Sequence, residues 1–278
     1  MDGSPVRHDA CRGRCVAFPV DADTLWEIVE PLLPGFRVRP QCGGQAALDD
    51  QAVFTAIVYV LPSGCAWGHL PPSFGSASRP PIGVSQPGPG GVFDQLRRQV
   101  LDRLGAGGGL DWSTAILDAA HVRAKKGSLT GPSPVDRGKN GSKVHILSDA
   151  DGIPPMTAVN WANTYDSVML QPTVTAIGEA VRSRRGPRRR PGRLRADKGY
   201  DDRVHRRWLR ARGIVPRIAR RGVDSSERLG RYRWKIERTL AWLTGYRRLT
   251  SRYERHGEHF AGFPQLAAAL TCSKKVAK

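Results

Sequence analysis

The sequence predicts an α/β fold: a core of mixed strands and helices preceded by a small all-helical region. Before residue 110 the apolar residues recur at helical spacing, whereas short apolar or alternating segments typical of strands begin only near residue 112. Strands come first and then alternate with helices, which favours an α/β core over a helical bundle. The length of 278 residues suits one large domain and a smaller one.

The N-terminal part divides into a tail and a helical region. Residues 1–20 show no periodicity and are predicted to be a loose tail, and residues 21–110 are predicted to form a small helical domain. Its helices are expected at 25–34, 48–61 and 92–104. Within this region, residues 71–91 hold six prolines and five glycines, so we expect that segment to lack regular structure.

Residues 111–278 are predicted to form the α/β domain. An apolar strand is expected to end at Asp118, and two later segments are expected to pair as a hairpin. The other expected elements are a helix kinked by or beginning near Pro172, and a long basic helix at the C-terminal end. In order, the segments that contain the strands are 114–122, whose strand ends at Asp118, 142–152, which ends in a turn, 153–162, 193–197 and 214–218. The helices are 166–183, 202–213 and 227–249.

The charge balance points to a polyanionic partner. Lysine and arginine total 44 against 25 acidic residues, a formal net charge of +19, and each phosphate that such a surface neutralises releases condensed counterions. An acidic membrane surface is the competing partner. No segment approaches roughly 18 consecutive apolar residues, and the N-terminus lacks the apolar core of a signal peptide, so we expect no membrane contact and a location in the cytosol.

Three acidic residues stand where catalytic metal ligands are expected. Asp118 and Asp197 each end an apolar run, and Glu237 lies in the long basic helix beside its buried side. Phosphodiester chemistry uses two divalent cations about 4 Å apart, held by carboxylates on neighbouring strands and a helix. Each residue also has a structural interpretation: Asp118 can satisfy backbone donors, Asp197 can cap a helix, and Glu237 can form an ion pair with Arg233.

Several motifs together resemble one protein family. The chain is similar to bacterial insertion-sequence transposases of the DDE type, of the insertion sequence five type within the broader IS-four-like group, over most of residues 20–275. The matching segments are LDAAHVRAKKG (117–127), TGPSPVDRGKNGSKVHILSDADGIP (130–154), ANTYDSVML (162–170), ADKGYDD (196–202) and RYRWKIERTLAWLTGYRRLTSRYER (231–255). The resemblance implies a ribonuclease-H-like core whose three acidic ligands are Asp118, Asp197 and Glu237.

The resemblance also implies the reaction and its partners. Such an enzyme binds double-stranded DNA at the terminal inverted repeats of its element, cleaves it with two Mg²⁺ ions, for which Mn²⁺ can substitute, and joins the ends to target DNA. A homodimer assembled on DNA is expected, and no small-molecule substrate. The likeness fails across 71–91 and then resumes, which two compensating reading-frame slips would explain. In the C-terminal signature, Gly230 replaces an expected tyrosine and Thr244 an expected basic residue.

Basic residues around these motifs are candidates for phosphate contacts, and a solvated basic loop is the alternative for each of them. Residues 182–195 contain eight arginines in 14 positions, which suits a segment that follows the DNA backbone. The candidates are Lys125, Lys126, Arg137, Lys139, Lys143, Arg188, Arg189, Arg190, Arg233, Arg247 and Arg248.

Two other functions stay open at the level of the sequence. A decayed transposase would bind DNA without cutting it, and a general nuclease with the same metal core would cut DNA that lacks the element ends. Metal-dependent nicking that needs the element ends and is abolished by Asp197→Ala separates the transposase from both.

Overall fold

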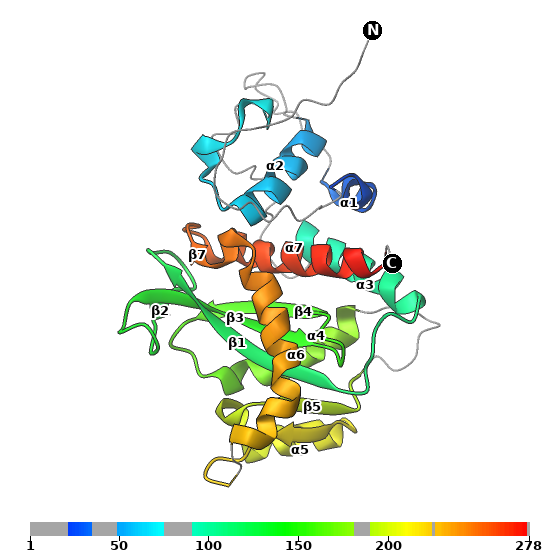
Figure 1. Cartoon of the computed structure of the whole chain (residues 1–278), viewed down its shortest axis with the longest axis vertical. Helices are drawn as coiled ribbons and strands as arrows, with labels where there is room; N and C mark the ends of the chain where they lie inside the picture. Colours follow the sequence, from blue (N-terminus) through cyan, green and yellow to red (C-terminus); the bar gives the residue numbers. More distant parts are fainter. Residues whose placement is uncertain (1–21, 35–48, 75–90, 181–189, 224–225, 277–278) are drawn as a thin grey trace.

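The computed structural model describes residues 22–34, 49–74, 91–180, 190–223 and 226–276. A mixed sheet forms its centre (Figure 1). Strand β1 (Ala115–Ala124) lies in the middle, antiparallel to β3 (Asn140–Ser148) on one side and parallel to β5 (Arg193–Ala196) on the other. Strand β4 (Met156–Trp161) pairs with β3, and β6 (Val215–Ile218) pairs with β5.

Two short strands complete the sheet. Strand β2 (Gly131–Pro132) pairs with β3, and β7 (Ser251–Arg252) pairs with the far end of β1. The prediction that the first strand ends at Asp118 is wrong, because β1 continues for six residues beyond it as far as Ala124. The sequence pattern misled there because the apolar run AIL stops at Asp118, whereas the backbone of the following residues stays paired with β3.

Helices lie on both faces of the sheet. Helix α6 (Ser226–Thr244) packs against β1 and β3 and crosses in front of β1 in Figure 1. Helix α4 (Leu170–Ala180) follows a short 3-10 turn, η4 (Asp166–Met169), and packs against β3 and β4. Helix α5 (Arg203–Ala211) joins β5 to β6, as the strand–helix alternation of the sequence predicts.

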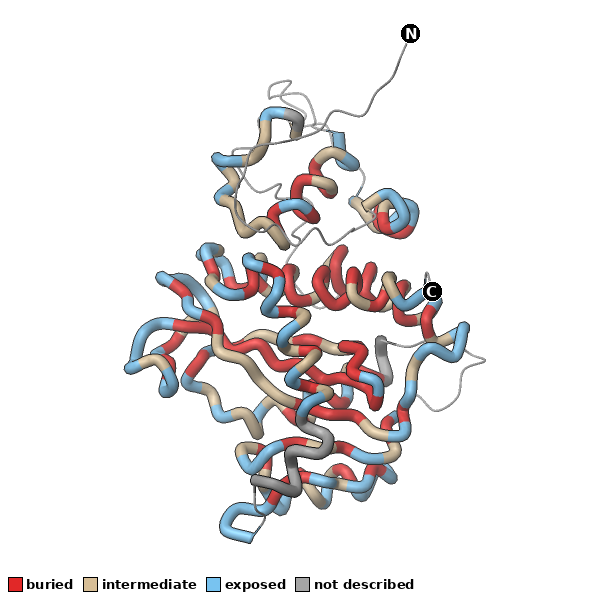
Figure 2. Tube along the Cα trace, viewed as in Figure 1, coloured by how far each residue is buried: buried red, intermediate tan, exposed pale blue. Residues whose placement is uncertain are grey.

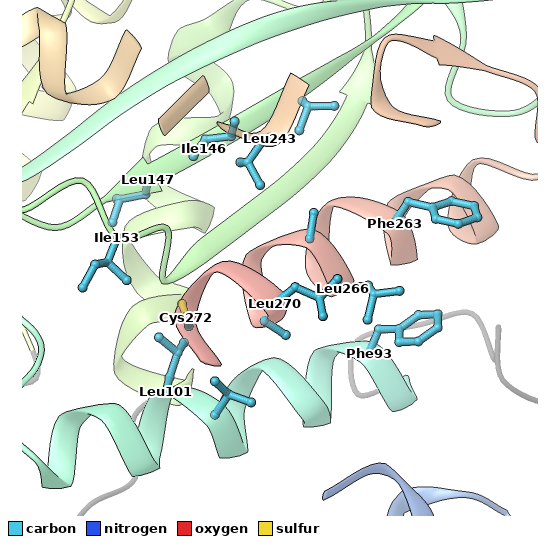
Figure 3. Close-up of a cluster of buried hydrophobic side chains, with 14 of the residues drawn as sticks. Phe93, Leu101, Ile146, Leu147, Ile153, Leu243, Phe263, Leu266, Leu270 and Cys272 are labelled. Atoms are coloured by element: carbon cyan, nitrogen blue, oxygen red, sulfur yellow. The ribbon is translucent and has the colours of Figure 1, made fainter. Parts of the chain in front are cut away.

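The C-terminal helix α7 (Gly257–Val276) was not predicted from the sequence. Gly257, Gly262 and Pro264 interrupt the usual helical pattern, and the proline removes one backbone donor from the helix. Burial offsets that cost: Phe263, Leu266 and their buried neighbours pack between helix α3 (Val92–Ala106) and the end of the sheet (Figure 3). The α3–α7 pair thus extends the sheet core towards the N-terminal helices.

The N-terminal helices α1 (Ala22–Val29) and α2 (Asp50–Ser63) contain buried apolar residues, and buried positions are red in Figure 2. Asp49 caps α2 by accepting a hydrogen bond from the Ala52 amide at 2.9 Å, and Gly64 ends it in the left-handed region at φ 66°. After two 3-10 turns, η2 (Trp67–His69) and η3 (Pro72–Phe74), the remainder of the proline- and glycine-rich segment falls outside the described residues.

Two buried arginines join the C-terminal segment to the rest of the molecule. Arg248 bonds Glu254 and the Cys65 carbonyl, which joins the end of α6 to the N-terminal helical part. Arg252 donates to the carbonyl oxygens of Ser128 and Leu129 and to the hydroxyl of Ser142. A further 3-10 turn, η6 (Arg247–Leu249), leads from α6 into this segment. Among the described helices, none is both long and apolar enough to cross a membrane.

Arg252→Met is expected to lower the free energy of unfolding by about 3 kcal/mol or more, because it removes a buried guanidinium group that donates hydrogen bonds to Ser128, Leu129 and Ser142. Urea denaturation of the whole chain measures the change. Arg255→Met, at an exposed position three residues further on, is the matched control and should change stability by less than about 0.5 kcal/mol. Equal effects of the two substitutions would contradict this role of Arg252.

Candidate active site

The strand register places Asp118 and Asp197 side by side. In the parallel β1–β5 pair, Ala115 faces Leu194 and Ile116 faces Arg195, so two residues further along each chain Asp118 lies level with Asp197. Neighbouring strands are about 4.8 Å apart, and residues at the same level of two paired strands point to the same face. The first two sequence-predicted ligands are therefore brought together by backbone pairing.

That face is the one covered by α6. Asp118 lies opposite Ile146 in the antiparallel pair, and Ile146 lies next to Leu243 of α6 (Figure 3). The side chain of Asp118 is half-buried, and its Oδ1 accepts a hydrogen bond from the Ala119 amide at 2.8 Å. The Asp118 carboxylate is thus placed between the sheet and the helix that carries the third candidate.

Asp197 both ends β5 and caps the next turn. Its Oδ1 accepts a hydrogen bond from the Gly199 amide at 2.8 Å, which starts the 3-10 turn η5 (Lys198–Tyr200). The helix α5 has its own cap, because Asp202 accepts from the Val204 amide at 2.7 Å. The interpretation of Asp197 as the cap of the helix that begins near Asp201 is therefore wrong. Asp197 caps the turn η5 instead, and this bond uses one of its two carboxylate oxygens. The residue itself is exposed.

Glu237 is exposed on the flank of α6. It lies about 100° round the helix from the buried Ile236, on the side opposite Lys235. Lys235 and Thr239 bind the carbonyl oxygens of Ala150 and Gly152 in the turn between β3 and β4. These two bonds fix the rotation of α6 about its axis, so Glu237 is held on the flank away from that turn.

The three carboxylates are hard oxygen donors of the kind that Mg²⁺ prefers. Asp118 and Asp197 fit a shared cation by their register, and Glu237 comes from the helix over the same face. Among the described residues, however, no three His, Cys, Asp or Glu side chains form a ready metal-binding cluster. Convergence of Asp118, Asp197 and Glu237 therefore stays a prediction. The backbone pairing of β1 with β5 brings only the two aspartates to the same level.

A fourth carboxylate, which the sequence did not single out, lies beside this pair. A Cβ atom added to Gly199 would be 3.0 Å from Asp197 Oδ1 and 3.4 Å from Asp166 Oδ2, so both oxygens border the same small space. Asp166 also pairs with the buried Lys143, whose Nζ lies 2.7 Å from Asp166 Oδ1. The motif ANTYDSVML contains this aspartate, but nothing in its spacing links it to Asp197.

Behind η5 lies a chain of buried polar groups. The Tyr200 hydroxyl is 3.5 Å from His145 Nδ1, and His145 Nε2 is 3.1 Å from Asn160 Oδ1. Burial lowers the pKa of His145 to about 4, so the imidazole is neutral near pH 7. Burial, and then the negative charges of Asp166, Asp118 and Asp197, raise the pKa of Tyr200, so its hydroxyl stays protonated.

The candidate phosphate contacts divide into three groups. Two of them are contradicted: Lys143 is buried against Asp166, and Arg248 is buried against Glu254, so neither presents its charge on the surface. Three have side chains outside the described residues, namely Arg188, Arg189 and Arg233. The exposed remainder are Lys125, Lys126, Arg137, Lys139, Arg190 and Arg247.

Comparison with known proteins finds two matching families. The family described as "Transposase DDE domain" matches residues 112–271, and the family described as "Putative transposase of IS4/5 family" matches residues 22–80. A putative transposase for insertion sequence element IS402 of Burkholderia cepacia is 46% identical over 144 residues, which are 51% of this chain and 68% of that protein. An uncharacterized 16.2 kDa protein of insertion element IS402, from the same organism, is 32% identical over 127 residues, 43% of this chain and 84% of that protein.

His145 is expected to make the folded state less stable as the pH falls from 6.5 to about 4. The unfolded chain binds a proton in this range that the folded chain does not, so the free energy of unfolding falls by about 3 kcal/mol in total. His145→Gln should flatten this dependence, measured as urea midpoints at several pH values. Asp149, whose pKa burial raises to about 6, acts with the opposite sign but equally in both proteins, so the difference between them isolates His145. Parallel pH curves for the two proteins would contradict the assignment.

Proposed function

The chain belongs to the family of DDE transposases of insertion sequences, and we propose that it cuts its element at the terminal inverted repeats and joins the freed ends to target DNA. The family works on DNA and depends on a divalent metal. The observation that carries the proposal is the level placement of Asp118 and Asp197 on paired strands under α6. A metal-dependent strand-transfer site needs carboxylates that are close together on a rigid support, and neighbouring paired strands provide this.

We propose Asp118, Asp197 and Glu237 as the ligands of two Mg²⁺ ions, with Mn²⁺ as a substitute. When bound, such ions activate the attacking oxygen and stabilise the leaving oxygen of the phosphodiester. The contributions of the chain itself are positional. The sheet fixes the spacing of the two aspartates, and the bonds of Lys235 and Thr239 fix the flank of α6 from which Glu237 projects.

At one end of the sheet, exposed lysine and arginine side chains are placed where they could bind DNA phosphates. Lys125 and Lys126 follow the end of β1, and Arg137 and Lys139 lie in the connection between β2 and β3. Because β2 and the end of β1 both pair with the start of β3, these four side chains come from one part of the molecule. We propose that this part holds phosphates of the element end, and that two subunits act together on the two ends as a homodimer.

Asp197→Asn is expected to reduce Mg²⁺-dependent cleavage of a DNA carrying the element ends to background, because a neutral amide is a poor ligand for a hard cation. DNA binding at low salt should persist or tighten slightly. Cleavage is measured on end-bearing and end-free DNA in parallel. Asp202→Asn is the matched control, because asparagine preserves the α5 cap, and it should cleave normally.

Two results would count against the transposase assignment. Equal cleavage of DNA without the element ends points to a general nuclease. Full cleavage by Asp197→Asn removes Asp197 from the metal site.

Replacing Lys125, Lys126, Arg137 and Lys139 by glutamine should weaken binding to all DNA sequences. The slope of log affinity against log salt should fall by up to about 0.9 for each phosphate that the variant no longer neutralises. Fluorescence anisotropy at several salt concentrations gives the slope. Replacing Arg103, an exposed cation on α3, by glutamine should leave the slope unchanged within error. A normal slope for the fourfold variant would place the DNA elsewhere.

A further inference from the structure

Asp197 has little direct support of its own. It is exposed, it follows a strand of only four residues, and one of its oxygens is bonded to the next turn of the chain, at Gly199. The direction of its carboxylate therefore depends on what holds η5 in place. Two buried polar contacts reach η5 from the face of the sheet opposite α6.

The first contact is a directed hydrogen-bond chain. A neutral imidazole has one N–H donor and one acceptor nitrogen. With His145 neutral, Nε2–H donates to Asn160 Oδ1, and Nδ1 accepts from the Tyr200 hydroxyl, which is the arrangement that satisfies both neighbours. Tyr200 is 1% exposed, and it is the last residue of η5. This hydrogen-bond chain thus anchors η5 to β3 and to its neighbour β4.

The second contact is the ion pair of Lys143 and Asp166. Lys143 Nζ lies 2.7 Å from Asp166 Oδ1 and donates to the Thr164 carbonyl at 2.7 Å, so it holds the loop before η4. The other oxygen of Asp166 borders Gly199 together with Asp197 Oδ1. A Cβ atom at position 199 would be tightly placed against Asp197 Oδ1 and in ordinary van der Waals contact with Asp166 Oδ2, so glycine leaves more room where η4 and η5 meet.

The chemistry of this contact indicates a role beyond packing. Burying a lysine costs desolvation free energy, and an apolar pair of the same volume often stabilises a fold equally well. The ion pair instead places a positive charge beside Asp166, whose other oxygen borders the same space as Asp197 Oδ1, so it offsets the repulsion between these two carboxylates. This compensation is useful where the carboxylates must stay together before a cation arrives.

We propose that Tyr200 and the Lys143–Asp166 pair are positioning residues that hold the Asp197 carboxylate in its metal-binding orientation. This inference rests on the proposed function, in which Asp197 is a metal ligand. Tyr200 acts by anchoring η5 through His145, and Asp166 acts by bracing Gly199 while Lys143 balances its charge. None of the three has to touch DNA or a metal ion.

The test uses the conservative substitutions Tyr200→Phe and Asp166→Asn in the full chain. Each removes one polar interaction and keeps the shape of the side chain. Tyr246→Phe is the matched control for the first, because Tyr246 is 2% exposed and lies just beyond the C-terminal end of α6, away from the site. Asp136→Asn is the control for the second, because it breaks an ion pair with Arg123 in the exposed connection after β2.

Two measurements are made on metal-free protein without DNA, so neither depends on catalysis. Hydrogen exchange of the amides of residues 197–202 reports whether η5 has loosened, and Mn²⁺ titration followed by electron paramagnetic resonance reports metal affinity. Both site variants should exchange faster at these amides and bind Mn²⁺ about tenfold more weakly, as expected when a group that orients a ligand is removed. The controls should match the parent protein in both.

Charge compensation is tested by combining Lys143→Met with Asp166→Asn. If Lys143 balances the carboxylates, the double variant should bind Mn²⁺ more tightly than Asp166→Asn alone, since the single change leaves an unpaired positive charge beside the site. Additive weakening in the double variant would overturn the charge part of the proposal. Unchanged exchange and Mn²⁺ affinity in both single variants would overturn the whole of it.

The failure of the proposed function has a different signature. If Asp197→Asn binds Mn²⁺ as well as the parent protein, then Asp197 is not a metal ligand, whatever Tyr200 does. If Asp197→Asn binds no Mn²⁺ while Tyr200→Phe and Asp166→Asn retain it, the function stands and the positioning role falls.

Discussion

The parallel pairing of β1 with β5 is the constraint on which the candidate site depends. A one-residue slip in this register would turn Asp118 or Asp197 to the opposite face of the sheet, because side chains alternate along a strand. The register is protected by apolar residues on both strands, since Ala115, Leu117 and Leu194 are almost completely buried. The level placement of Asp118 and Asp197 is thus secured by the same hydrophobic burial that stabilises the sheet.

The two faces of the sheet differ in the polarity of their buried side chains. The face under α6 carries Asp118 among apolar neighbours, whereas the other face carries buried polar groups: Lys143, His145 and Asn160. Such groups are costly unless each finds a partner, and all three do, through Asp166 and Tyr200 as well as one another. The polar layer therefore specifies where η4 and η5 sit, while the apolar layer supplies most of the stability.

The sequence predicted most of this arrangement where local pattern and tertiary structure agree. Alternation and apolar runs located the strands, and the family motifs identified Asp118, Asp197 and Glu237 as candidates. It failed where long-range pairing decides: the strand after Asp118 continues because β3 pairs with it, and α7 forms because α3 and the sheet cover it. Lys143 and Arg248 looked like surface cations because the sequence gives no sign of their partners, Asp166 and Glu254.

Helix α6 and the turn after it are hydrogen-bonded to the rest of the molecule at two places. Near its middle, α6 is fixed to the β3–β4 turn by Lys235 and Thr239, and beyond its C-terminal end Arg248 bonds the carbonyl of Cys65 in the N-terminal helical part. The helix that carries Glu237 and the turn that follows it are therefore bonded both to the sheet and to the N-terminal helical part. Because Glu237 is the one candidate ligand that does not come from the sheet, its position depends on these bonds. The positions of the two aspartates depend instead on the strand register.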